Sequence, residues 1–407
     1  MNQRPIVFLA AGKSQLPLIE RAGELGFESW AFDRDAKAPG AEAATRFAAV
    51  SARDADAVLS RLRPWAAEEA PAGIVSGSAA PGALLASALV GRSLGLRTTA
   101  HSSIKRILDR GAQRTALIAA SVPVPPATIV IGVEEAISSV ERAGRAVLKP
   151  ASGTSGSTGV AFVQPGPDLE LRARAAEAAG DGRIVIEEVL TGDEYSIDAL
   201  AFEDSARVIS ITRKETELNP PLPIAFSTVS STVEERTRTS LFLELVDMVA
   251  TALDIKHMAF NLDVICTSNG PVVIEVGCYL DAKIDRLLHF AGRDVYGALC
   301  QLSVGEVPKE WKPLNEGVSS RFLYSARLME LSAKDMQAAE EIVSAKGARL
   351  EWQVAPGAEV RPARALEDTL GWILCREKTG EAARKLAESL TREVAAMLVL
   401  GRDELGD

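Results

Sequence analysis

The segment Leu148–Val160 reads "LKPASGTSGSTGV", and the interpretation of the whole chain depends on it. Gly, Ser and Thr fill eight of the nine positions 151–159, directly after Lys149 and a proline. An isolated Gly/Ser run is usually a flexible surface loop. Here Lys149 ends an apolar strand pattern, and the run leads straight into another, "GVAFV" (Gly159–Val163). Small residues with accessible N–H groups, hydroxyls and a lysine together favour a phosphate-binding loop between two strands.

Acidic positions downstream of this loop suit the rest of a nucleotide. No Gly-Lys-Ser/Thr follows the glycines, so the loop is not a Walker A motif. The segment Glu187–Leu190 ends an apolar strand pattern, where a backbone N–H and C=O can pair with the edge of an adenine. Glu194 follows the turn at Gly192 and can accept hydrogen bonds from ribose hydroxyls. Acids at strand ends are more often solvated, but their order after the lysine favours nucleotide binding.

The segment "AFNLDVICTSNGPVVIEV" predicts a β-hairpin, because Asn269-Gly270 is a strong turn signal between two apolar strands. Counting outward from the turn places Asp263 and Glu275 within about one residue of cross-strand register. Whether the two carboxylates share a face depends on the loop length. Two carboxylates beside a triphosphate suit Mg²⁺, which takes few protein oxygens. The alternative is an ordinary polar face, although Glu275 lies in an apolar run and needs a partner.

The first hundred residues alternate apolar strand patterns with helical ones. The strand patterns are "PIVFLA", "FESWAFD" and "GIVSG", and the alternation predicts a parallel sheet covered on both faces. The first turn, Ala10–Gln15, lacks GxGxxG, which argues against a dinucleotide site. A basic helix, "SIKRILDRGAQRTALIAAS", opens a second region, and an amphipathic helix over 234–253 precedes the hairpin.

Composition limits the class of protein. A chain of 407 residues is too long for one core, so two to four domains are expected. The net charge of −10 argues against nucleic acid or anionic membrane as a partner. Four scattered cysteines and three histidines form no metal-ligand spacing. The N-terminus lacks the basic lead and cleavage site of a secretory signal, and no apolar run is long enough for a membrane span, so we expect a cytoplasmic protein.

With loop, adenine segment and hairpin in this order, the chain resembles the ATP-grasp superfamily of carboxylate–amine ligases. The likeness is to the purine-biosynthetic and carbamoyl-phosphate-synthase-like branch and covers nearly the whole chain. It implies an ATP-grasp fold of mixed α/β and α+β class. Residues 1–103 would form a parallel-sheet preATP-grasp domain, and 104–310 the nucleotide-binding region, with a lid subdomain at about 127–190. Residues 311–407 would form a small C-terminal α+β subdomain.

The resemblance also implies ATP and Mg²⁺ as cofactors and gives individual residues roles. Lys149 matches the phosphate-binding lysine, Glu194 the ribose acid, and Asp263 and Glu275 the magnesium carboxylates. Arg110 stands where the family usually has a lysine at the head of a helix. The lid loop and the adenine segment match at Gly153, Ser155, Gly156 and Ser157, and at Glu187, Glu188, Val189 and Leu190.

The chain departs from the family in "EVGCYLDAK". The family pattern Glu-x-Asn-x-Arg would place a metal-binding Asn at Gly277 and, at Tyr279, an Arg that steadies the acyl phosphate. Asp281-Ala282 replace the glycines that follow. Substrate contacts are expected from the segments 213–226 and 279–286. The candidate replacement cations are Arg213, Lys214, Lys283 and Arg286, and the candidate substrate-binding residues are Phe226, Tyr279 and Asp281.

The resemblance implies an ATP-dependent ligase that joins a carboxylate to an amine through an acyl phosphate. An amino acid is the expected substrate, and ADP and phosphate are released. One alternative keeps the fold but uses bicarbonate, in carboxylase or carbamoyl-type chemistry. The other is a catalytically weak ATP-binding protein with a regulatory role, suggested by Gly277 and Tyr279. The expected partners are small molecules, and a homodimer is common in this family. No motif identifies the carboxylate or the amine.

Overall fold

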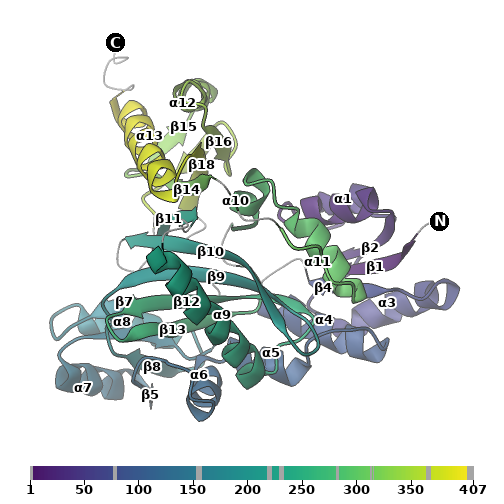
Figure 1. The fold of residues 1–407 in the computed structure, drawn as a ribbon, viewed down its shortest axis with the longest axis horizontal. Helices are drawn as coiled ribbons and strands as arrows, with labels where there is room; N and C mark the ends of the chain where they lie inside the picture. The colour runs from purple at the N-terminus through teal and green to yellow at the C-terminus, as the bar shows by residue number, and fades with distance from the viewer. Residues whose placement is uncertain are drawn as a thin grey trace.

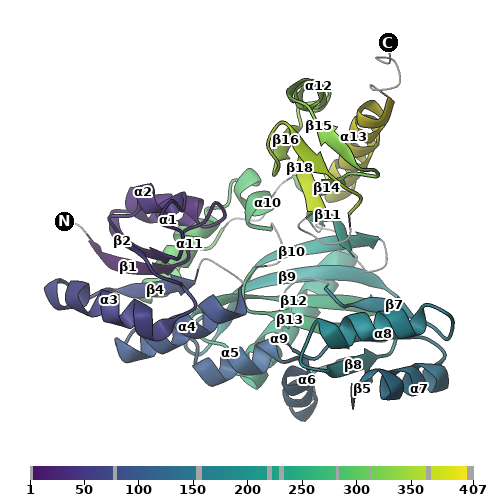
Figure 2. The ribbon, with the colours of Figure 1, turned by 180° about the vertical axis from the view of Figure 1, so that it is seen from behind.

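The computed structural model describes residues 3–76, 80–152, 158–217, 222–228, 233–280, 284–311, 314, 316–363 and 368–400. Figures 1 and 2 show a parallel sheet near the N-terminus, a large central sheet, a small sheet beside it and a C-terminal part made of both helices and strands. No helix in these ranges is long and apolar enough to cross a membrane.

The N-terminal sheet is parallel, in the order β3-β2-β1-β4, as the strand–helix alternation predicted. Alternate residues of β1 supply two cores. Ile6 packs with Leu18 of α1 on one face, and Val7 packs with Leu62 of α3 on the other. Both faces are therefore covered. The elements are β1 (Gln3–Leu9), α1 (Leu16–Glu24), β2 (Phe27–Asp33), α2 (Gly40–Ala43), β3 (Arg46–Ala49), α3 (Ala55–Glu68), β4 (Gly73–Ser76) and α4 (Pro81–Ser93).

The basic segment after His101 forms two helices, α5 (His101–Leu108) and α6 (Arg110–Ala119), so the prediction of one continuous helix is wrong. Asp109 has an extended backbone, and its side chain accepts a hydrogen bond from the N–H of Ala112. An aspartate in this position caps the start of a helix, and here it begins α6 in a new direction. The break places Arg110 in the first turn of α6.

The small sheet has the order β5-β8-β6-β7, with its outer helices α7 and α8. Strands β6 and β7 pair antiparallel, so the Gly-rich segment joins two neighbouring strands, as predicted. The elements are β5 (Ala127–Ile131), α7 (Val133–Ala143), β6 (Ala146–Pro150), β7 (Ala161–Val163), α8 (Leu169–Ala178) and β8 (Arg183–Glu187).

The central sheet has eight strands in the order β13-β12-β9-β10-β11-β14-β18-β16. Helix α9 covers one face, and the small sheet lies on the other side, as Figures 1 and 2 show from opposite directions. The sheet continues across the boundary expected at 310/311, because β11 pairs with β14. Its strands are β9 (Asp193–Ala201), β10 (Ala206–Glu217), β11 (Leu222–Thr228), β12 (Met258–Thr267), β13 (Gly270–Gly277), β14 (Gly317–Tyr324), β16 (Arg349–Trp352) and β18 (Thr369–Glu377).

The remaining elements cover the central sheet or its ends. Helix α13 packs on β14 and β18, and α11 returns to the N-terminal sheet, where it contributes to the core around Leu18. These elements are α9 (Val233–Leu253), α10 (Ile284–Phe290), α11 (Val295–Val304), β15 (Met329–Leu331), α12 (Ala333–Ser344), β17 (Ala358–Val360) and α13 (Gly380–Leu400).

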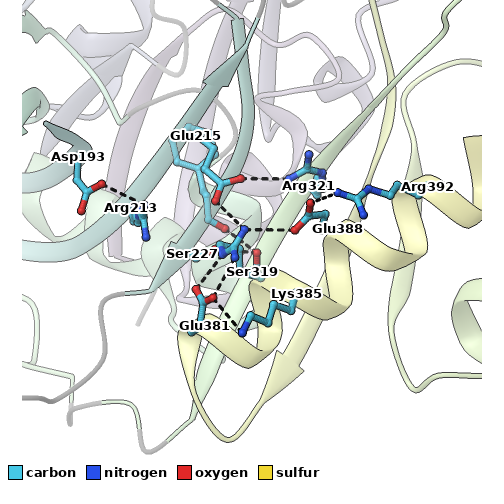
Figure 3. A network of polar contacts seen from close by, with 12 residues as sticks. Asp193, Arg213, Glu215, Ser227, Ser319, Arg321, Glu381, Lys385, Glu388 and Arg392 are labelled. Atoms are coloured by element: carbon cyan, nitrogen blue, oxygen red, sulfur yellow. Dashed lines mark hydrogen bonds and ion pairs between the residues drawn. The ribbon is translucent and has the colours of Figure 1, made fainter. Parts of the chain in front are cut away.

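An ion-pair network joins α13 to the face of the central sheet that α13 covers (Figure 3). Glu215 of β10 accepts from Arg321 at 3.2 Å and from Arg384 at 3.1 Å. Arg384 also lies 2.8 Å from Glu381 and 3.3 Å from Glu388. The hydrogen bond from Arg384 lowers the pKa of Glu381 from 4.5 to about 2.

Replacing Glu381 by Gln is expected to weaken the acid sensitivity of folding. A carboxyl whose pKa is lowered in the folded state stabilises it above the unfolded pKa of 4.5, and this contribution is lost as the pH falls toward about 2. Because Glu381 is half-exposed, we expect the free energy of unfolding that is lost between pH 4.5 and about 2 to be smaller in the variant by only about 0.5–1 kcal/mol. Urea unfolding at several pH values measures it. Glu377→Gln, at an exposed carboxylate, is the control, and an equal effect of both variants would contradict the assignment.

Candidate active site

The central sheet presents a polar face to the side away from α9. Along β9, Tyr195 and Ile197 pack into the core under α9, so the residues between them point the other way. Lys214 pairs with Glu194 across β10 and β9, and Asp263 pairs with Glu275 across the hairpin. The polar face is formed by Glu194, Ser196, Asp198, Lys214, Asn261, Asp263 and Glu275.

The hairpin register agrees with the prediction to within one residue, and the structure settles the question that the sequence left open by placing the two metal candidates on one face. Asp263 and Glu275 are direct cross-strand partners, just before an irregularity in the register at Val264. Directly opposed residues of an antiparallel pair have Cβ atoms about 5 Å apart. The two carboxylates can therefore act on the same ligand.

Lys214 links the ribose candidate to a metal candidate. Its Nζ lies 2.6 Å from Oδ2 of Asp263 and 3.3 Å from Oε1 of Glu194. The hydroxyl of Thr216 also donates to Glu194, at 3.3 Å. Among the candidate replacement cations in the described residues, Lys214 is thus the one that forms an ion pair with a predicted metal ligand.

Arg110 connects the other metal candidate to the lysine-bearing strand. Its guanidinium donates to Oε1 of Glu275 at 2.6 Å and to the carbonyl of Pro150 at 3.0 Å. Burial alone would raise the pKa of Glu275, but the charges of Arg110 and Lys149 outweigh it, so the pKa of this carboxyl lies below its usual value. Glu275 is therefore ionised at neutral pH.

Lys149 lies in a buried charge cluster with Glu187. Its Nζ is 2.8 Å from Oε2 of Glu187 and donates to the carbonyl of Ile274 at 3.0 Å. Arg114 of α6 binds the other oxygen of Glu187. Lys149, Glu187 and Arg114 all have side chains less than a tenth exposed. The Glu187 side chain thus lies inside the protein, in a position that holds Lys149 against β13.

The expected adenine segment continues from this cluster. Glu188 is exposed, and its backbone N–H donates to the carbonyl of Pro126 at 3.0 Å. Val189 and Leu190 follow it and are partly buried. The segment leaves the small sheet here and enters β9 of the central sheet, so it connects the two sheets.

Other predicted site residues lie apart from the carboxylates. Arg213 points to the opposite face from Lys214, as adjacent strand residues must, and pairs with Asp193 at 3.0 Å. Arg286 pairs with Glu351 at 2.8 Å and stacks over Trp372 at 4.3 Å.

One of the substrate-binding candidates lies in a hydrophobic core, and a second packs against it. Phe226 is 1% exposed and packs against Phe322, although it lies on the same side of the sheet as Lys214. Tyr279 packs against the core that contains α10, and burial raises its pKa. The remaining predicted site residues, Gly153, Ser155, Gly156, Ser157, Asp281 and Lys283, lie outside the described residues.

The sequence interpretation gave no role to two polar side chains that the structure places here. Arg114 lies one turn after Arg110 on α6, and the i, i+4 spacing of two arginines was the available signal. Asn261 comes two residues before Asp263 and so shares its face, which the alternation of a strand could have revealed.

The arrangement fits a magnesium nucleotide. No cluster of three or more His, Cys, Asp or Glu side chains suited to a metal occurs in the described parts of the chain, so Asp263 and Glu275 stand as a pair. Mg²⁺ is commonly held by one or two carboxylates together with phosphates and water. Arg110, Lys149 and Lys214 supply the positive charge that a triphosphate requires.

Comparisons with known proteins agree with this fold. Residues 144–282 match a family described as "ATP-grasp domain". No curated protein matches the sequence of the chain. The fold is similar to that of an L-amino acid ligase from Bacillus licheniformis, with a TM-score of 0.77, 18% identity, and 97% of this chain and 98% of that one covered.

Two further structures are similar. The N5-carboxyaminoimidazole ribonucleotide synthetase from Thermotoga maritima has a TM-score of 0.72 and 14% identity over 96% of this chain and 98% of that one. The biotin carboxylase domain of the 2-oxoglutarate carboxylase from Hydrogenobacter thermophilus, in complex with MgADP, ADP and bicarbonate, has a TM-score of 0.69 and 16% identity over 95% of this chain and 89% of that one. At these identities the likeness establishes the fold.

Proposed function

The chain contains an ATP-grasp domain at residues 144–282, as its sequence predicted, and on this premise we propose that it is an ATP-dependent carboxylate–amine ligase. The observation that carries the proposal is the facing pair Asp263 and Glu275, bordered by Lys214, Arg110 and Lys149. This is a site for a divalent cation and a polyphosphate on one face of a sheet.

Binding of a metal nucleotide at this face would replace two ion pairs of the protein. Asp263 is paired with Lys214, and Glu275 with Arg110. When the two carboxylates turn to a divalent cation, both basic side chains become available to phosphate oxygens. Bound Mg²⁺ supplies neutralisation of the β- and γ-phosphate charge. Glu187 keeps the Lys149 ammonium beside β13, so its position is set before the nucleotide arrives.

The reaction proposed is a two-step acyl transfer. The substrate carboxylate attacks the γ-phosphorus and releases ADP, which leaves an acyl phosphate. The amine then attacks the acyl carbon, phosphate departs, and an amide bond forms. The protein contributes positioning and charge stabilisation and no covalent nucleophile. The similarity of the fold to an L-amino acid ligase supports an amino acid as substrate.

A second candidate is bicarbonate-dependent chemistry. The similar biotin carboxylase domain, whose structure contains bicarbonate, favours it, at a TM-score of 0.69 against 0.77 for the L-amino acid ligase. A regulatory protein that binds ATP without turnover is the third candidate. Its basis is the glycine at position 277 and the tyrosine at 279, where the family pattern has Asn and Arg.

Release of ADP from MgATP is expected only when a carboxylate and an amine are both present. The assay pairs each of the twenty amino acids with every other and analyses positive reactions by mass spectrometry, with and without ¹³C-bicarbonate. An amide product without the label supports the ligase. Labelled product would establish the carboxylase instead, and ATP binding without phosphate release in every pair would favour the regulatory protein.

A further inference from the structure

Asn261 is a largely buried residue on the polar face, and the proposed nucleotide site gives its side chain no role. It lies on β12, two residues before Asp263, and is 8% exposed. Its carboxamide makes no hydrogen bond with the described residues, whereas the nearby carboxylates of Asp263 and Glu275 are paired with cations. The polar atoms of Asn261 are not among the buried, unpaired ones of the described residues, so its carboxamide stays accessible from the polar face. A carboxamide in this position is available to a ligand bound by the two carboxylates.

The direction of the Asn261 side chain follows from its cross-strand partner, Gly277. A Cβ atom built on Gly277 would lie 2.1 Å from Oδ1 of Asn261 and 3.8 Å from its Nδ2. The carboxamide oxygen therefore occupies the space where any side chain at position 277 would begin. Gly277 does not have the positive φ that usually calls for glycine. A side chain at position 277 would therefore displace the Asn261 oxygen from its present position.

The register places this oxygen beside the metal candidates. The pair Asn261–Gly277 is two positions along the hairpin from the pair Asp263–Glu275, so all these side chains leave the same face. Residues two apart on a strand are separated by about 7 Å, which is within the combined reach of an asparagine and an aspartate converging on one ion. The two carboxylates already balance the charge of a divalent cation. A neutral oxygen is then the suitable further ligand, because Mg²⁺ and Mn²⁺ prefer oxygen donors.

We propose that Oδ1 of Asn261 is a third protein ligand of the divalent cation bound by Asp263 and Glu275, and that Gly277 is required because it leaves room for this oxygen. The inference rests on the proposed function, since it concerns the same nucleotide site. In this inference the third ligand comes from Asn261 on β12, because its partner on β13, Gly277, has no side chain that could bind the cation.

The test measures Mn²⁺ binding by electron paramagnetic resonance in the presence of a non-hydrolysable ATP analogue. Asn261→Ala and Gly277→Ala are each expected to weaken Mn²⁺ binding by about tenfold or more. In Gly277→Ala the new methyl group takes the place of the Asn261 oxygen. The exchange variant Asn261→Gly/Gly277→Asn returns a carboxamide from the opposite strand, and binding is expected to recover to within about threefold of wild type. Asn269→Ala, at the exposed hairpin turn, is the control.

Fluorescence measurements of analogue binding without metal distinguish loss of the third metal ligand from loss of the whole nucleotide site. Wild-type Mn²⁺ affinity in Asn261→Ala would overturn the inference and leave the proposed function intact. So would an exchange variant as weak as the single variants, provided that thermal unfolding shows it to be folded. If the wild type binds neither analogue nor Mn²⁺, the proposed function itself fails, and the inference fails with it.

Discussion

Replacement of Glu187 by Gln is expected to lower the free energy of unfolding by about 3–5 kcal/mol. Glu187 is 3% exposed and is the shared carboxylate of Lys149 and Arg114, whose side chains are 7% and 8% exposed. Removing its charge leaves two buried cations without their counter-ion. Breaking a buried pair from one side costs far more than the pair itself contributes, because the remaining charge stays desolvated.

Urea unfolding measures this effect as a lower midpoint with an unchanged dependence on denaturant. Glu188→Gln is the matched control, since the same substitution one residue later affects an exposed side chain and should change stability by less than about 0.5 kcal/mol. Similar losses in the two variants would show that the buried cluster does not determine the stability of this region. The result also bears on Lys149, because a lysine held by Glu187 is positioned before any nucleotide binds.

Replacement of Glu275 by Gln is expected to reduce turnover by at least about a hundredfold and to cost less stability than Glu187→Gln. Arg110 is only 9% exposed, but it keeps its hydrogen bond to the carbonyl of Pro150, and the Glu275 side chain that it pairs with is 38% exposed. In the proposed reaction the same carboxylate binds the cation at the transferring phosphate. Loss of one such electrostatic contact typically costs about 10²–10³ in kcat.

The measurement is kcat for ADP release with the substrate pair found in the amino-acid assay, together with urea unfolding of the same variant. Asp193→Asn is the control, because Asp193 is an acid of the same sheet whose partner, Arg213, points to the opposite face. Turnover near the wild-type rate in Glu275→Gln would contradict the metal role of the hairpin.

Much of the architecture was predictable because the signals are local. The Asn269-Gly270 turn sets the hairpin register to within one residue, and two apolar strand patterns flanking the Gly-rich segment predict that it joins neighbouring strands. The alternation of strands and helices in the first hundred residues predicts the parallel sheet. The helix break at Asp109 was missed, because helical periodicity continues through "LDRGAQR" and only the cap geometry ends the first helix.

The roles of individual charged residues were less predictable. Arg213, Lys214 and Arg286 are all basic residues near the expected site, and the sequence offers no basis for choosing among them. Strand alternation turns Arg213 away, the pairing of β9, β10 and β12 brings Lys214 to Asp263, and contacts with Glu351 and Trp372 hold Arg286 near β16 and β18.

The sequence by itself predicted the ATP-grasp fold, the order of the proposed nucleotide-binding segments and the register of Asp263 and Glu275 to within about one residue, since each follows from turn residues, apolar periodicity and motif order within short segments. The register irregularity beside Asp263, which no local pattern predicted, makes the two residues direct partners. Only the tertiary structure decided which side chains accompany that pair. Lys149 meets Glu187 and Arg114, and Asn261 fills the space above Gly277, through contacts between segments far apart in the chain. Such contacts depend on packing and desolvation, and neither is encoded in a local pattern.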